Sequence, residues 1–165
     1  MLLTRFTDTV AGVLRAAGWS EGRVAESSRE TIAFLEAWCF SVPPSVVLAI
    51  QEFDGLNCYN PDTGSSLTFD AKAAMRWSCP DYSPVLEWVI GELVCPIAHG
   101  NRMILFLGAS GNSVWLHEEL SGFAREKDLA TGLNTHFTAD YSSVDWHELD
   151  ADNIWSTLRQ IRASP

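Results

Sequence analysis

The chain has 165 residues, the usual length of one domain, and a domain of this size buries about 70% of its unfolded surface without needing disulfides or metals. Hydrophobic residues make up 47% and charged residues 19%, which excludes a disordered or collagen-like chain. The net charge is −10 and no basic stripe exists, so binding to nucleic-acid phosphates is not expected.

Apolar spacing predicts helices in the N-terminal third. The first covers residues 4–17 and has Gly18 as its C-terminal cap. The second begins at Ser27 or Ser28, since serine is a good N-cap. The third opens at the Pro43-Pro44 pair and stops at Gly55.

The pattern then changes to short strands. β-prone runs at 56–60 and 67–70 flank the turn 61–64 and predict a hairpin. Residues 77–83 are expected to be a loop and 84–93 a helix.

A second strand region begins at residues 95–97. The run 102–107 predicts a buried strand, and residues 109–112 form a turn before a return strand over 113–118. Residues 123–136 fit a loop or a fraying helix equally.

A last helix is expected after Asp150 or Asp152. The whole predicts one α+β domain over 1–165, with N-terminal helices followed by a mixed or antiparallel sheet flanked by helices.

The four cysteines predict reduced, buried thiols. None forms a C-x-x-C pair, and each has apolar or aromatic neighbours (Cys39, Cys58, Cys79 and Cys95). This usage is typical of a cytoplasmic protein, and neither a disulfide framework nor a metal site is expected. The longest apolar runs are far shorter than the roughly 20 residues of a membrane span, and no signal peptide is expected at the start.

No catalytic motif is found. The chain has no G-x-S-x-G elbow, no H-E-x-x-H, no phosphate-binding loop and no zinc-deaminase signature. Four histidines could act as bases, but none is paired with a nucleophile in the sequence. We therefore expect neither catalytic residues nor a cofactor.

Seven tryptophans are unusual for this length, and tryptophan both fills cores and anchors interfaces. Trp38 and Trp88 lie near inward helical positions and are expected in the core. Exposure is expected for Trp77, Trp146 and Trp155.

Acidic residues are concentrated between Arg29 and Lys72, where no cation occurs. The cluster consists of Glu30, Glu36, Glu52, Asp54, Asp62 and Asp70. It could attract a cationic partner, or it could serve only solubility.

Several segments together resemble the third subfamily of the SUKH superfamily. Residues 13–23, VLRAAGWSEGR, are similar to its A-G-W-x-x-G-R opening. Residues 53–56, FDGL, resemble its F-G-G-L motif with Asp54 in place of the first glycine. Residues 94–97, VCPI, resemble its C-P-x-G segment with Ala98 where glycine is usual.

The resemblance implies an immunity protein of a bacterial polymorphic toxin system. Such a protein binds a cognate toxin domain, of nuclease or deaminase type, without catalysis. The motif residues are interpreted as structural, in caps, turns and packing (Gly18, Trp19, Gly55, Leu56, Pro96 and Gly111).

Toxin contacts are expected from exposed acids and aromatics. The predicted contacts are Glu52, Asp54, Tyr59, Asp62, Trp77, Asp81, Tyr82, Glu118 and Glu119. Two alternatives stay open: a regulatory protein-interaction domain of the same fold without a toxin partner, and a small hydrolase. The sequence predicts no oligomeric state.

Overall fold

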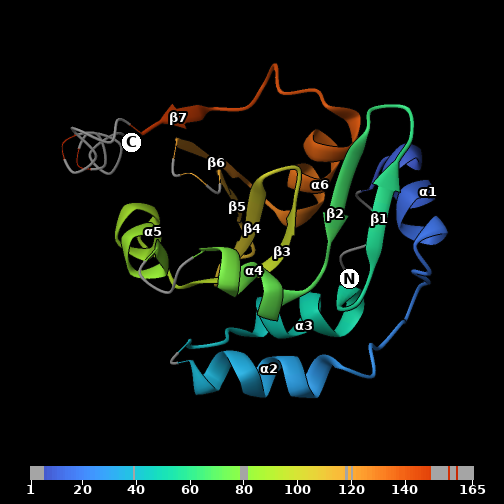
Figure 1. The fold of residues 1–165 in the computed structure, drawn as a ribbon, viewed down its shortest axis with the longest axis horizontal. Helices are drawn as coiled ribbons and strands as arrows, with labels where there is room; N and C mark the ends of the chain where they lie inside the picture. Colours follow the sequence, from blue (N-terminus) through green and yellow to red (C-terminus); the bar gives the residue numbers. More distant parts are fainter. Residues whose placement is uncertain are drawn as a thin grey trace.

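The computed structural model describes residues 6–38, 40–78, 82–117, 119, 121–149, 156 and 159. Within them it has six helices and seven strands (Figure 1). The helices are α1 (Asp8–Ala16), α2 (Ser28–Ala37), α3 (Pro44–Phe53), α4 (Ala71–Ser78), α5 (Tyr82–Ile90) and α6 (Leu129–Thr138). The strands are β1 (Asn57–Asn60), β2 (Ser65–Thr68), β3 (Val94–Gly100), β4 (Met103–Gly108), β5 (Ser113–His117), β6 (Gly122–Glu126) and β7 (Trp146–Glu148). The predicted α+β class is confirmed.

The described strands form one antiparallel sheet in chain order, from β1 to β7. The central strands β3 to β6 pair over several residues each, whereas β2 pairs with β3 only between Thr68 and His99. The β1–β2 hairpin therefore extends away from the central strands and lies beside α1 (Figure 1). The pairing of β3 with β4 shifts between Pro96 and Ala98, which fits the preference of proline in strands for bulges and edges.

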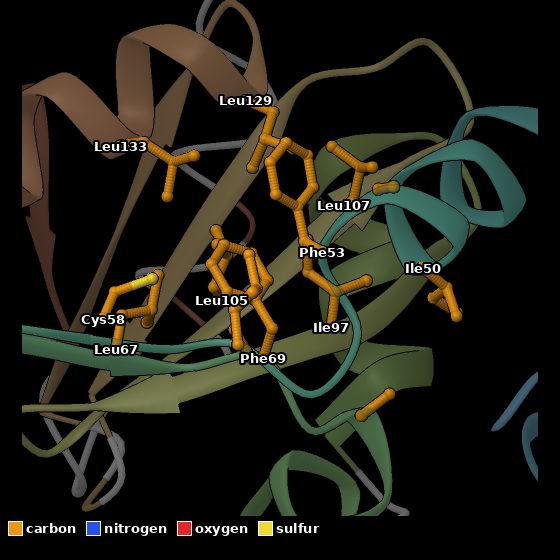
Figure 2. Packing of buried hydrophobic residues seen from close by; sticks show 14 of the residues in the cluster. Ile50, Phe53, Cys58, Leu67, Phe69, Ile97, Leu105, Leu107, Leu129 and Leu133 are labelled. Carbon is orange, nitrogen blue, oxygen red and sulfur yellow. The ribbon is translucent and has the colours of Figure 1, made fainter. Parts of the chain in front are cut away.

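Each face of the sheet carries its own apolar cluster. The larger cluster joins α1, α2, α3 and α6 to one face, and Figure 2 shows Phe53 and Phe69 in it beside Leu105 and Ile97. The smaller cluster joins α4 and α5 to the other face. The rings of Phe53 and Phe69 stack at 5.1 Å.

The end of α1 confirms the predicted glycine cap. Gly18 has φ +95°, a conformation that glycine adopts without steric penalty. The Trp19 amide donates to the Leu14 carbonyl (3.0 Å) and the Gly18 amide to that of Arg15 (3.0 Å). This pair of bonds is a Schellman motif, and it turns the chain so that Trp19 enters the core.

Two further expectations are confirmed. The Pro43-Pro44 pair opens α3, with Pro44 in its first turn. The hairpin predicted around residues 61–64 forms between β1 and β2.

Other expectations are wrong. Residues 71–78 form α4, and α5 begins at Tyr82, so much of the expected loop at 77–83 is helical. For residues 123–136, where a loop or a fraying helix is expected, the helix is confirmed from Leu129 on as α6, whereas the strand β6 before it is not predicted. Trp38, expected in the core, is 51% exposed. It follows the last residue of α2, and its ring lies against Phe34 with 6.1 Å between the centroids.

The last predicted helix, with its caps Asp150 and Asp152, lies outside the described residues apart from two positions. No helix in the described part is long and apolar enough to cross a membrane.

Candidate functional site

The A-G-W-x-x-G-R segment serves the fold. The buried Trp19 ring donates through Nε1 to Oε1 of Glu52 (3.1 Å). The Arg23 guanidinium donates to the carbonyl oxygens of Glu52 (2.6 Å) and Asp54 (2.7 Å). These contacts satisfy carbonyls that the end of α3 leaves without helical partners, so the motif holds α3 to the segment after α1.

Two predicted toxin contacts lie in this same region. Asp54 is only 6% exposed, and its Oδ2 accepts from Ser27 Oγ (2.5 Å) and Thr31 Oγ1 (2.9 Å). Glu52 is half-buried, and this burial raises the pKa of its carboxyl group. Both side chains have internal partners that explain their presence.

The other predicted contacts that the structure describes are at the surface. Tyr59 is 59% exposed on β1, and Asp62 is exposed in the following turn. Trp77 is 58% exposed and stacks on His99 (6.3 Å). Glu119 is exposed and forms an ion pair with Arg102.

The structure brings only some of these residues together. Of the predicted contacts, Trp77 lines a hollow of about 190 Å³ together with Arg102, which is the ion-pair partner of Glu119. Asp81, Glu118 and the Tyr82 side chain lie outside the described residues.

Another pocket lies between α6, the central strands and the segment leading to β7. Its volume is about 260 Å³. We call it the α6 pocket, and its lining residues are Asn101, Met103, Trp115, Ala124, Glu126, Thr135, His136, Tyr141, Val144 and Trp146. Most of this lining is apolar or aromatic, which is typical of binding sites.

The base of the α6 pocket is held by ring stacking and a hydrogen bond. The His136 ring is stacked on Trp115 with 4.7 Å between centroids and 9° between planes. His136 Nε2 lies 2.9 Å from the Ser66 carbonyl oxygen. Burial lowers the pKa of His136, so the ring is neutral near pH 7 and donates from Nε2 to that carbonyl.

The rim of the α6 pocket is aromatic and partly exposed. Tyr141 is 55% and Trp146 is 39% exposed, which confirms the expectation for Trp146. A Cβ at Gly122 would lie 2.6 Å from the Trp146 ring. The absence of a side chain there lets the indole lie against the backbone of β6. Glu126 adds a carboxylate, whose Oε1 accepts from Thr135 Oγ1 (3.0 Å).

Sequence reasoning missed most of the α6 pocket. Glu126 and His136 lie in the segment that was ambiguous between loop and helix, and Tyr141 lies in an irregular connection. The one available signal was Trp146, an aromatic residue off any apolar stripe.

The described cysteines are inert. Cys58 and Cys95 are buried and free, and desolvation raises the pKa of each thiol to about 12. They are therefore protonated at neutral pH and poor nucleophiles. In the described part of the chain, no three His, Cys, Asp or Glu residues gather as metal ligands.

Comparison with protein families identifies the chain. A family model described as SUKH-3 immunity protein matches residues 6–133, well over half of the sequence. The chain belongs to the SUKH-3 immunity protein family. The match begins before α1 and ends within α6, so it includes six of the seven described strands completely, β1 to β6. No curated protein and no solved structure matches the chain in the corresponding comparisons.

Proposed function

We propose that this SUKH-3 protein is an immunity protein that binds a cognate bacterial toxin domain and neutralises it without catalysis. The observation that carries the proposal is the family match over residues 6–133. A binding role is supported by the buried histidine of the α6 pocket, which is held by stacking and by a backbone hydrogen bond.

The charge of the chain supports a cationic partner. The net charge of −10 attracts a positively charged surface and speeds encounter. Nucleases and nucleic-acid deaminases bind phosphate backbones with Lys and Arg residues, so their substrate clefts offer such a surface. We infer that the toxin is of this type.

The exposed aromatics supply anchors for the interface. Tyr59, Trp77, Tyr141 and Trp146 are each at least 39% exposed. Aromatic residues of this kind contribute disproportionately to protein–protein binding energy. The α6 pocket has two of them, Tyr141 and Trp146, at its rim.

The test is co-expression with the C-terminal domain of the large secreted protein encoded beside this gene. We expect survival of cells that die with the toxin domain alone, and a complex in pull-down with a catalytically inactivated toxin. The matched control is an unrelated SUKH protein, which should neither rescue nor bind. Toxicity without rescue or complex would contradict the proposal and favour a regulatory interaction domain.

A further inference from the structure

We propose that the α6 pocket receives an arginine side chain of the partner, with its guanidinium between the rim aromatics and Glu126. The inference rests on the proposed function in one respect, that the partner is a cationic protein. It adds the chemistry of the residue that enters the pocket.

The size of the α6 pocket suits one side chain. Its volume is about 260 Å³, just below the range of about 300–1,000 Å³ that small-molecule sites occupy. The pocket is open at the rim, where Tyr141 and Trp146 are exposed. A long side chain projecting from another protein can therefore enter without any movement of the core.

The walls suit a long side chain with an apolar stem. Met103, Ala124 and Val144 offer aliphatic surface, against which the methylene groups of arginine pack. Tyr141 and Trp146 offer aromatic rings at the rim. A guanidinium is attracted to such rings by cation–π interaction and also stacks on them.

The carboxylate of Glu126 makes the pocket select a positively charged ligand group. In the part of the chain that the structure describes, no Lys or Arg forms an ion pair with it. Its neighbour Arg125 points to Glu92, with 3.7 Å between Nη2 and Oε1. The described lining of the pocket contains no arginine or lysine, and His136 is neutral. Glu126 is thus the charged side chain among these lining residues. Arginine is preferred over lysine because its planar fork both stacks and pairs with a carboxylate.

The experiment titrates short peptides into the full chain and follows the tryptophan indole signals by NMR. The probes are Ac-Ala-Arg-Ala-NH2, the same peptide with lysine, and the same peptide with citrulline. Citrulline keeps the shape of arginine but has no charge. We expect the arginine peptide to shift the Trp146 indole resonance in a saturable way, the lysine peptide to bind more weakly, and the citrulline peptide to have no saturable effect.

Two variants localise the effect. Glu126→Gln keeps an oxygen that accepts from Thr135, so the fold is retained while the charge is lost. It should weaken binding of the arginine peptide roughly fivefold, as expected for a partly exposed ion pair. Glu36→Gln is the matched control, because Glu36 is exposed on α2, outside the α6 pocket, and the substitution removes the same charge. Equal binding of arginine and citrulline peptides, or equal effects of the two variants, would overturn the proposal.

Repeating the co-expression assay with the two variants separates this inference from the proposed function. If the wild-type chain rescues, E126Q should bind the toxin more weakly than E36Q does. Rescue by wild type with identical toxin binding by both variants would overturn the arginine pocket and leave the immunity function standing. Absence of rescue by wild type would contradict the immunity function, and the peptide titration would still decide the chemistry of the pocket.

Discussion

Asp54 lies where α2 begins and α3 ends, and its carboxylate accepts the hydroxyls of Ser27 and Thr31. We predict that Asp54→Ala lowers the free energy of unfolding by about 2–4 kcal/mol, because two hydrogen bonds to a charged group are lost and the hydroxyls lose their acceptor. Urea denaturation measures the change. Asp62→Ala removes an exposed carboxylate and should stay within about 0.5 kcal/mol of wild type. Equal losses for both variants would contradict this role of Asp54.

His136 makes stability depend on pH. Burial lowers its pKa in the folded protein, whereas the unfolded chain takes up the proton near the ordinary value of about 6.5. Below about pH 6.5 the unfolded chain therefore binds more protons than the folded protein. The free energy of unfolding is unaffected by His136 above this pH and decreases as the pH falls from there toward the lowered folded-state pKa. We expect the free energy of unfolding to decrease between pH 7.5 and pH 5.5, as measured by denaturant titration at each pH.

The variant His136→Gln identifies the source of this slope. Glutamine can still donate to the Ser66 carbonyl but takes up no proton, so the pH dependence should flatten. His117→Gln changes a histidine at the end of β5 that is not fully buried, and it serves as the control. An unchanged slope in H136Q would assign the pH dependence to other groups.

At the scale of the elements, α6 packs closely against the sheet at Gly132. A Cβ there would lie 2.3 Å from Ser113 Oγ and 2.9 Å from Trp115 Nε1, whereas a Cβ at Gly12 in α1 meets nothing within 4 Å. Gly132→Ala should destabilise by about 1–2 kcal/mol, since overpacking outweighs the gain in helix propensity. Gly12→Ala should stabilise by roughly 0.5–1 kcal/mol. Thermal unfolding of the two variants checks the opposite signs, and a shared sign would refute close packing at Gly132.

Local signals explain which elements were predictable. The cap at Gly18 and the hairpin around residues 61–64 depend on neighbouring residues, so the sequence contains their cause. In the segment with β6 and α6, the local signal is the side-chain N-cap of Asp128. Gly132 weakens the helix propensity after it, and α6 is buried by contacts with α1, β2, β5 and β6 that are distant in the chain or not readable from it.

The candidate site was hidden for a related reason. Residues that line the α6 pocket are spread from Asn101 to Trp146, and they meet only through the sheet register together with the packing of α6 and the segment after it. Asp54 illustrates the converse: its charge suggested a surface contact, but the hydroxyls that bury it are 23 and 27 residues away in the chain. Charge and residue type are readable from sequence, whereas burial at such sites is decided by tertiary contacts.

For the whole molecule, the sheet separates two environments. One face is covered by α4 and α5, and the other by α1, α3 and α6. The α6 pocket lies on the second face, where the segment leading to β7 closes it. The site is thus built on a rigid sheet and a packed helix, and only its rim is drawn from an irregular connection.

The net charge of −10 and the single carboxylate of the α6 pocket should act on different steps of binding. Long-range attraction raises the association rate, and salt screens it. We therefore expect the association rate with a cationic toxin to fall about tenfold or more between low and high salt, as measured by stopped-flow or surface plasmon resonance. Glu126→Gln removes one of many acidic charges, so its association rate should stay near wild type while its dissociation rate rises. An association rate that is insensitive to salt would rule out electrostatic steering by the whole chain, whatever E126Q does to dissociation.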